Sequence, residues 1–427
     1  MTAGMTRQNA RQREREGHHF ERPHRPLGLR AANLAGGALR RVRHRALSLE
    51  RDELIATARR RTGLSDAGLD LAPAGTYREG LDVLLDSLER DARLTPSGRY
   101  FAREQVVTSL ANRLLLGEAR RAQPRLETPV VAPPVVVVGL PRSGTTFLQH
   151  LLARDPEWRV LRQWEAPRPA ATRSTAADAA ARRATDRGMR LLDYLAPDAR
   201  ILHPVDTLEP TECVTLFSNS FASLELATIN QVPSYLQWCL EQPMDDPYAE
   251  YVLQLAVLEH AERKPRWLLK SPAHLFWLDR LVEVLPDVRI VQVHRDPLEV
   301  IGSFCSLSAV LCGIGSDHVD LHAMGARWAP AWAEGLARTD QVRRTLPDDC
   351  VVDVAHADLI ADPMGQVRRI YDTFGLDLSA AAFESMSEYS AGQQQHGRAA
   401  HRYTLAQFGL DSAVEHERFS RLSAPPK

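Results

Sequence analysis

The chain has 427 residues, of which 44% are hydrophobic and 25% charged, as in an ordinary folded protein rather than a disordered or fibrous one. Its formal net charge of −1 indicates no polyanionic partner, so we expect no nucleic acid ligand. This length predicts one large elaborated domain or two domains.

Apolar runs and cysteines bear on where the protein works. The longest unbroken apolar stretch is far shorter than a bilayer span, and the first residues lack a secretory signal, so we expect no transmembrane segment. The five cysteines are odd in number and scattered without CxxC spacing, which favours reduced thiols. Together these features predict a cytoplasmic protein.

The N-terminal part divides into two stretches. Residues 1–45 are arginine-rich with few large apolar side chains, and we expect a poorly ordered leader. The alternative is a basic arm that touches nucleic acid or an anionic membrane surface. Residues 46–128 carry apolar side chains at three- and four-residue spacing, which predicts a helical N-terminal region.

Strand-like and helix-like patterns then alternate. Residues 135–138 are a continuous run of valines, typical of a strand buried on both faces of a parallel sheet. Similar strand patterns recur at residues 267–269, 288–293 and 351–354, with helical patterns between them. This alternation predicts an α/β fold, a doubly wound parallel sheet flanked by helices.

We expect residues 129–427 to form this α/β domain. Residues from about 168 to 260 begin with an alanine- and arginine-rich stretch and are expected to be a helical insertion. Residues from about 390 to 427 form a polar C-terminal tail. The insertion and the helical N-terminal region are where we expect an acceptor pocket or lid.

The first strand leads into the loop GLPRSGTT, residues 139–146. Its GxxxxG spacing between a strand and a helix start turns backbone N–H groups inward and predicts an anion site. P-loop triphosphatases need a lysine after the second glycine, where this chain has Thr145. Arg142 instead places a cation at the mouth of the loop, which favours a nucleotide with a short 5′ anion. The predicted phosphate ligands are Arg142, Ser143, Gly144, Thr145 and Thr146.

The PRSGTT loop after a hydrophobic strand resembles the phosphosulfate loop of sulfotransferases that use 3′-phosphoadenosine-5′-phosphosulfate (PAPS). The arginine form is most similar to the tyrosylprotein and bacterial branches. The resemblance implies a P-loop-like fold and transfer of a sulfonate from PAPS to a hydroxyl of a small-molecule, lipid or glycan acceptor. It also implies that no metal takes part. The sequence is also compatible with a homodimer.

A PAPS enzyme must also hold a 3′-phosphate, and the stretch VRIVQVHRDPLEVIGSF at residues 288–304 provides a second anion site. Arg295 ends the predicted strand, Pro297 suits the first turn of a helix, and Ser303 follows on that helix. The pattern resembles the family's 3′-phosphate motif, in which the arginine and the serine are ligands. We therefore expect Arg295 and Ser303 to bind the nucleotide.

Lys270 ends the predicted strand of RWLLKSPAH, and open α/β sheets bind ligands at the carboxyl ends of strands. The chain has only three lysines, so a lysine here is a weak, independent sign of a role that arginine cannot fill. By resemblance, this lysine contacts the transferring sulfonate. Lys270 and Arg142 would then stabilise the charge of the transition state.

Two residues compete as the general base that removes the acceptor proton. Glu165 in LRQWEAP resembles the acidic residue after the loop helix in the tyrosylprotein branch, and we favour it. His274 in KSPAH is the rival, although cytosolic sulfotransferases place their histidine nearer the lysine, where this chain has Pro272. Glu209 and Glu212 in TLEPTEC are weaker candidates for the base, and we interpret them instead as helix-start carboxylates that stabilise the helix dipole.

The tail stretch HGRAAHRYTLAQFGL resembles the C-terminal segment that covers the nucleotide in bacterial family members. Arg398 is expected to add a phosphate contact there, with His401 and Tyr403 nearby. The sequence leaves two alternative functions. A P-loop-type kinase would need ATP and Mg²⁺, and a non-catalytic nucleotide-binding module would bind without turnover.

Overall fold

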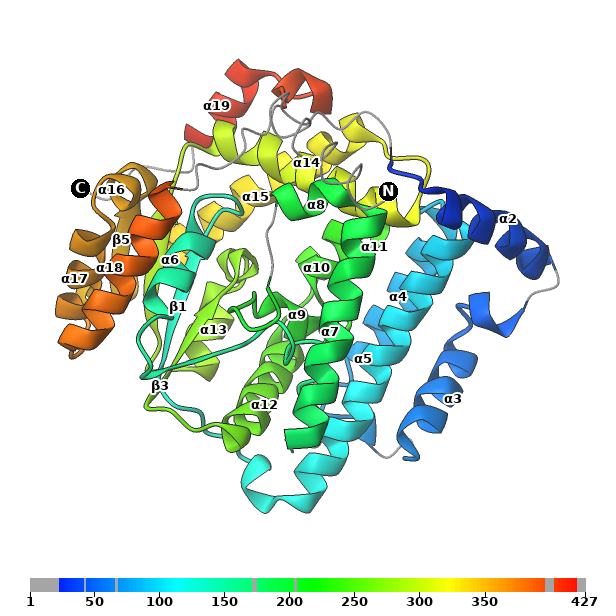
Figure 1. Cartoon of the computed structure of the whole chain (residues 1–427), viewed down its shortest axis with the longest axis horizontal. Coiled ribbons are helices and arrows are strands. Elements are labelled where there is room, and N and C mark those ends of the chain that lie inside the picture. Colours follow the sequence, from blue (N-terminus) through cyan, green and yellow to red (C-terminus); the bar gives the residue numbers. More distant parts are fainter. Residues whose placement is uncertain are drawn as a thin grey trace, which may run out of the picture.

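A single parallel sheet organises the protein. The computed structural model describes residues 23–41, 44–65, 68–170, 175–202, 206–395 and 403–420. Within these ranges the strands lie in the order β2-β3-β1-β4-β5, and every neighbouring pair is parallel (Figure 1). This confirms the predicted doubly wound α/β fold. The strands are β1 (Pro134–Gly139), β2 (Trp158–Val160), β3 (Arg266–Lys270), β4 (Arg289–His294) and β5 (Val351–Ala355).

The valines of β1 explain its central position. Val136 and Val138 pack into the apolar cluster on one face of the sheet, whereas Val135 and Val137 pack into the cluster on the other. All four are almost fully buried, as the unbroken valine run predicts. Val137 pairs with Lys270 on β3, so these two strands end at the same edge of the sheet.

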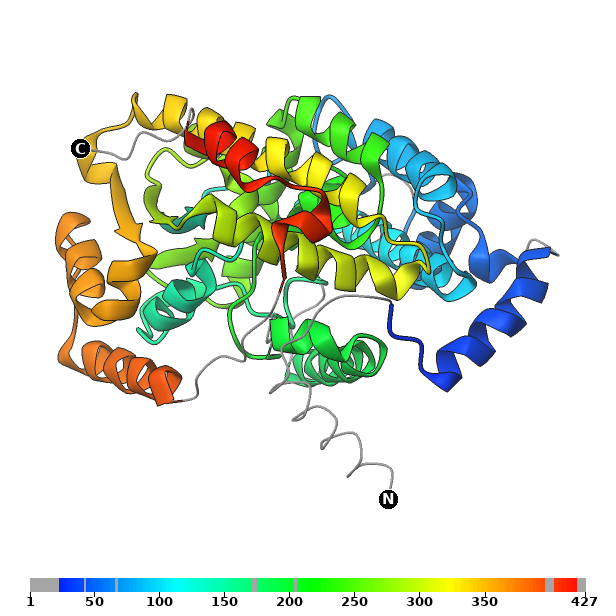
Figure 2. The same ribbon diagram turned by 90° about the horizontal axis from the view of Figure 1, so that it is seen from above.

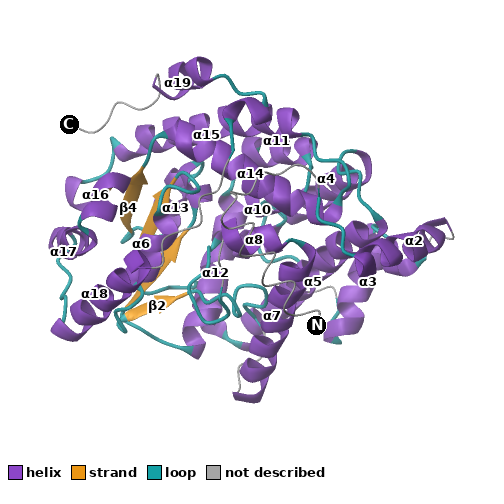
Figure 3. Ribbon diagram, turned by 45° about the horizontal axis from the view of Figure 1, so that its top comes forward, coloured by secondary structure: helices purple, strands orange, loops and turns teal. Residues whose placement is uncertain are grey.

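Helices cover both faces of the sheet, and Figure 3 shows the strands between them. The helices that share the cluster of Val135 are α6 (Thr145–Leu152), α16 (His356–Ala361), α17 (Pro363–Thr373) and α18 (Ala380–Gln395). The helices that share the cluster of Val136 include α12 (Asp245–Ala261), α13 (Leu278–Val284), α14 (Pro297–Gly315) and α15 (Leu321–Arg343).

The four strands expected from the sequence are all present, but β2 was not expected. It has only three residues, too few to show a period, and its central residue is the fully buried Arg159. A buried arginine inside a strand contradicts the apolar pattern by which strands are recognised. Only the packing around Arg159, described below, explains its position.

The side of the molecule away from α16–α18 is almost wholly helical (Figure 1). The helical N-terminal region and the helical insertion, both predicted, pack together there. The elements are α3 (Arg51–Thr62), α4 (Tyr77–Arg90), α5 (Pro96–Ala122), α7 (Thr175–Leu195), α8 (Pro197–Leu202), α9 (Val214–Phe217), α10 (Leu224–Ile229) and α11 (Pro233–Glu241). Short 3-10 helices are η1 (Arg45–Leu47), η3 (Pro124–Leu126), η4 (Ser218–Ser220), η5 (Pro272–Leu275), η6 (Asp348–Cys350) and η7 (Leu405–Phe408), and α19 (Ser412–Ser420) is the last described helix.

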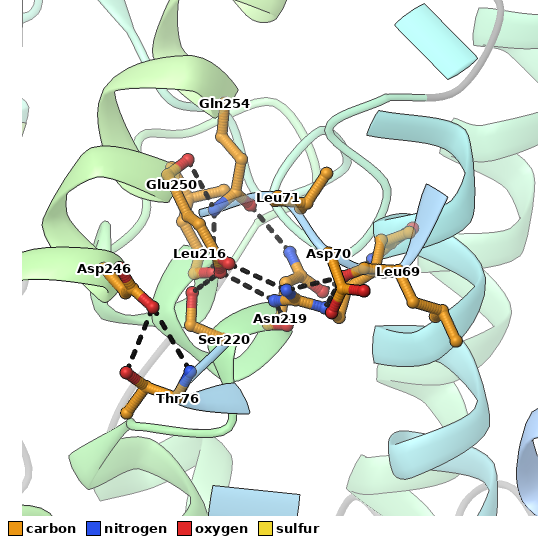
Figure 4. Close-up of polar contacts among 12 residues, drawn as sticks. Leu69, Asp70, Leu71, Thr76, Leu216, Asn219, Ser220, Asp246, Glu250 and Gln254 are labelled. Atoms are coloured by element: carbon orange, nitrogen blue, oxygen red, sulfur yellow. Dashed lines mark hydrogen bonds and ion pairs between the residues drawn. The ribbon is translucent and has the colours of Figure 1, made fainter. Parts of the chain in front are cut away.

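A buried polar network joins the N-terminal helices to the insertion (Figure 4). Arg113 on α5 donates to both carboxylate oxygens of Glu250 on α12, at 2.6 and 2.7 Å, and neither side chain is more than 3% exposed. Ser220 donates to the same carboxylate, and Asn219 donates to Gln254. Because the charges are paired and hydrogen-bonded, this network can lie in the core.

The structure corrects the prediction for the leader. Residues 1–45 were expected to be poorly ordered, but Leu27–Arg41 form helix α2, which projects at one side of the molecule (Figure 2). Arg25 donates to the carbonyl oxygens of Gly313 and Ser316 near the end of α14, at 2.6 and 2.7 Å. These contacts span almost 300 positions of sequence, so no local pattern could reveal them. Residues 1–22 lie outside the described part of the chain.

Among the described helices, α14 alone has the length and hydropathy of a membrane-spanning helix, by composition only. Of its most apolar window, 61% is buried within the protein, and buried core helices pass the same test. Its N-cap Asp296 accepts from the N–H of Leu298, and Pro297 is its first residue, as predicted.

Candidate functional site

The loop after β1 has the backbone of an anion cradle. Gly139 and Gly144 have φ angles of 144° and 103°, which disfavour any residue with a side chain. A Cβ atom on Gly139 would lie 2.5 Å from the carbonyl oxygen of Val293, so the loop also lacks space there. Helix α6 begins directly after Gly144, so its free N–H groups point out of the loop.

The side chains of the loop suit an anionic ligand. The hydroxyl of Ser143 is fully buried and has no hydrogen-bond partner among the described residues, although a buried hydroxyl normally has one. Arg142 has a φ angle of 69°, which is uncommon for a residue with a side chain and is found at functional turns. Both features fit the phosphate or sulfate group of a nucleotide.

The two anion motifs predicted from the sequence lie in contact. Arg142 Nε donates to the Ser303 hydroxyl at 3.3 Å, and Arg295 Nη1 donates to the backbone carbonyl of Arg142 at 3.1 Å. Arg295 also forms an ion pair of 2.8 Å with Glu299 on the first turn of α14. The end of β1, the end of β4 and the start of α14 therefore form one continuous cationic site.

Lys270 joins this site from β3. Its side chain is only 1% exposed, and its Nζ donates to the Thr146 hydroxyl at 3.2 Å and to Glu212 Oε1 at 2.6 Å. The next residue, Ser271, caps η5 by accepting from the N–H of Ala273, with Pro272 at the first position, as predicted. The lysine is thus held at the strand end beside the cradle loop.

The C-terminal segment reaches the same place. Tyr403 donates to the backbone carbonyl of Glu299, and a Cβ atom on Gly302 would lie 2.5 Å from its ring. Burial raises the pKa of Tyr403, whereas the positive charges of Arg295 and Arg142 lower it, which places the phenol near both arginines. Arg398 and His401 lie outside the described residues.

The structure contradicts the choice of Glu165 as base. Its carboxylate is fully buried, and its two oxygens accept from the guanidinium of Arg159, each at 2.9 Å. The backbone N–H of Arg162 donates to Oε2 as well, at 3.0 Å. Arg159 in turn lies against the Trp267 ring and donates to the Leu258 carbonyl, away from the cradle loop. Glu165 therefore neutralises a buried arginine and is not exposed to an acceptor.

The structure contradicts the rival base as well. His274 is fully buried between α9 and α12, with Nδ1 2.8 Å from the Tyr248 hydroxyl and Nε2 3.2 Å from Cys213 Sγ. Phe217, Tyr248 and Tyr251 surround its ring. Burial lowers the pKa of His274 to about 3. With both nitrogens in contact and no exposed surface, His274 has a packing role.

Glu212, which from the sequence ranks below Glu165 and His274 as a base, lies at the site beside Lys270. It comes from the 206–213 segment, which precedes α9 and crosses the edge of the sheet through an antiparallel bridge between Arg162 and Pro210. The interpretation of Glu212 as a helix-start carboxylate is wrong, because its carboxylate accepts from the ammonium of Lys270 and it precedes the first turn of α9. Glu209, by contrast, contacts Arg154 and lies 3.6 Å from His150.

Several contacts hold the 206–213 segment in place. Thr211 N–H donates to the Leu161 carbonyl at 2.8 Å, and Gln149 on α6 donates to the Thr211 carbonyl at 3.2 Å. Cys213 N–H donates to the Lys270 carbonyl at 3.0 Å. The residues on both sides of Glu212 are therefore fixed to the sheet. Within the described ranges, no three His, Cys, Asp or Glu side chains gather as a metal site requires.

Comparison with known proteins identifies the type of enzyme. A model described as the sulfotransferase family matches residues 133–380, more than half of the chain. The omega-hydroxy-beta-dihydromenaquinone-9 sulfotransferase Stf3 of Mycobacterium bovis and of Mycobacterium tuberculosis is 25% identical over 299 residues, which are 66% of this chain and 72% of the relative.

Two solved structures are also similar. The crystal structure of sulfotransferase STF1 from Mycobacterium tuberculosis H37Rv matches 87% of this chain and 99% of its own, with 33% identity and a TM-score of 0.72. That of sulfotransferase STF9 from Mycobacterium avium matches 88% and 96%, with 27% identity and a TM-score of 0.78. The family match and the geometry agree, and the chain belongs to the sulfotransferase family.

Proposed function

We propose that this sulfotransferase takes its sulfonate from PAPS and transfers it to a hydroxyl of an apolar small molecule or lipid. The observation that carries the choice of donor is the contact of the two anion motifs, Arg142 with Ser303 and Arg295 with the Arg142 carbonyl. A donor with phosphate groups on both the 3′ and the 5′ positions of one ribose requires two anion sites that are close together.

The residues divide between the two ends of the nucleotide. The N–H groups of the cradle loop, with Ser143, Thr145 and Thr146, would hold the 5′-phosphosulfate. Arg295 and Ser303 would hold the 3′-phosphate, and Arg142 lies between the two groups. Thr145 stands where a triphosphatase has the lysine for its terminal phosphates, so the loop suits a shorter 5′ group than ATP carries.

Exposed apolar side chains on α7 and on the 206–213 segment support an apolar acceptor. Leu191 and Tyr194 on α7, and Leu208 on the 206–213 segment, are 46%, 51% and 55% exposed. Thr207 of this segment donates to Asp186 of α7, so the two elements pack together. The relative named above as a dihydromenaquinone sulfotransferase has, by its name, a hydroxyl on a quinone-derived acceptor. An acceptor of similar apolar character would use these side chains.

Calorimetry with 3′,5′-bisphosphoadenosine and with ATP tests the donor. We expect the bisphosphate to bind more tightly than ATP by about 10- to 100-fold, since charge-assisted hydrogen bonds to the 3′-phosphate add about 1.5–3 kcal/mol. Tighter binding of ATP with Mg²⁺ would favour the kinase reading. Labelled PAPS with long-chain alcohols, phenols and glycans then tests the acceptor, and turnover of glycans alone would contradict the apolar preference.

A further inference from the structure

Glu212, the acidic partner of Lys270, is not among the proposed ligands of the nucleotide. Lys270 is 1% exposed, whereas Glu212, the other member of the 2.6 Å ion pair, is 29% exposed. The ammonium therefore lies on the protein side of the pair, and the carboxylate lies on the side that an acceptor can reach. The Thr146 hydroxyl, 3.2 Å from the same ammonium, ties both residues to the cradle loop.

From this placement we propose that Glu212 is the general base of sulfonate transfer, a role that rests on the proposed function. A base must lie within hydrogen-bond reach of the acceptor hydroxyl while that oxygen faces the sulfur. Lys270 contacts Thr146 of the loop and marks where the sulfonate would lie. Glu212 contacts Lys270 directly. Fixed backbone on both sides of Glu212 limits its movement.

The proposed step balances in bonds and protons. The acceptor oxygen forms a bond to sulfur while its proton moves to the Glu212 carboxylate. The bond between sulfur and the 5′-phosphate oxygen breaks, and its electron pair stays on that oxygen, where Lys270 and the loop N–H groups stabilise the negative charge. Glu212 then releases the proton to solvent, to which it is partly open.

The charged groups around Glu212 fit this role. Besides Lys270, they include Glu225 on α10, whose pKa is raised chiefly by burial and further by the negative charge of Glu212. Thr215 and Ser218 donate to Glu225 at 3.1 and 2.8 Å. On the other side lies His150, whose pKa burial lowers, with the charge of Lys270 acting in the same direction.

The test is a Glu212→Gln variant, which can still accept a hydrogen bond from Lys270 but cannot take a proton. We expect kcat to fall by about 10²- to 10⁴-fold, while affinity for 3′,5′-bisphosphoadenosine and the melting temperature stay near those of wild type. Partial recovery of kcat is expected in Glu212→Ala when formate is added, since formate can replace the missing carboxylate. The matched control is Glu209→Gln on the same segment, which should keep wild-type turnover.

Two outcomes would overturn the assignment. A near-normal kcat in Glu212→Gln excludes Glu212 as the base. A loss of affinity for 3′,5′-bisphosphoadenosine as large as the loss of kcat would show that Glu212 only orders Lys270. Glu212→Asp, which retains a carboxylate, is the test variant if Glu212→Gln does not fold. Its turnover should exceed that of Glu212→Ala. Should wild-type protein itself bind no bisphosphoadenosine, the proposed function fails instead, and the two failures are thereby distinguished.

Discussion

Two ion pairs next to the sheet have opposite characters. Arg159 and Glu165, on β2 and just after it, are both 0% exposed, and each oxygen of the carboxylate accepts from the guanidinium. Lys270, at the end of β3, is 1% exposed and contacts Glu212 Oε1 at 2.6 Å, and Glu212 is 29% exposed. The first pair is fully buried, whereas the carboxylate of the second pair is partly exposed.

This difference separates a structural carboxylate from the one proposed as the base. A buried arginine costs stability unless its charge is neutralised, so Glu165 is needed for folding whatever reaction the enzyme performs. A base, in contrast, needs a reachable oxygen and a route for the proton. The position of Glu165 after the loop helix suggested a base. Its pair with Arg159 is instead a buried structural ion pair, like the separate pair of Arg113 and Glu250.

The largest expected effect would come from breaking the fully buried pair. Glu165→Gln removes both carboxylate contacts of the buried Arg159 and leaves only its 4.0 Å ion pair with Glu262, so we expect the free energy of unfolding to fall by about 3–5 kcal/mol. Chemical denaturation measures this, and the kcat of the protein that remains folded should be of wild-type order. The control Glu262→Gln removes the partner of Arg162, a carboxylate that is 34% exposed and only the more distant, 4.0 Å partner of Arg159, and it should cost about 1 kcal/mol or less. Normal stability with abolished turnover would restore Glu165 as base.

A smaller effect is expected at the cationic site. Arg295→Ala removes the proposed 3′-phosphate ligand, and affinity for 3′,5′-bisphosphoadenosine should fall by about 10- to 100-fold, the equivalent of about 1.5–3 kcal/mol. Affinity for adenosine 5′-phosphosulfate, which has no 3′-phosphate, should change much less. Titration calorimetry with both ligands makes the comparison. Equal losses for the two compounds would contradict the assignment of Arg295 to the 3′-phosphate.

The smallest expected effect concerns His274. Because its pKa in the folded protein is about 3, below the ordinary value of about 6.5, only the unfolded chain takes up its proton between these two values. Stability should therefore fall with falling pH in this window, by up to about 1.4 kcal/mol per pH unit from this group. His274→Gln should remove that part of the slope, measured by denaturation from pH 6.5 downward. An equal slope in wild type and in His274→Gln would contradict this account.

Local patterns predicted most of the fold and the cationic part of the site. The valine run, the glycine spacing of the loop and the Ser271-Pro272 cap each act within a few residues, and each is found as expected. Arg142, Arg295 and Ser303 were assigned from two such motifs, and parallel strand order then brought the motifs into contact. Strand β2 was missed because three residues with a buried arginine carry no period.

By itself, then, the sequence determined the parallel sheet, the cradle loop and the second anion motif, because turn chemistry and strand periodicity depend on neighbouring residues. Tertiary structure alone decided which carboxylate is open to an acceptor. Glu212 contacts a lysine 58 positions away, whereas Glu165 is buried with its partner Arg159 and His274 is enclosed beside α12. Burial and charge pairing arise from such distant contacts, and they separate a reactive side chain from one that only stabilises the fold.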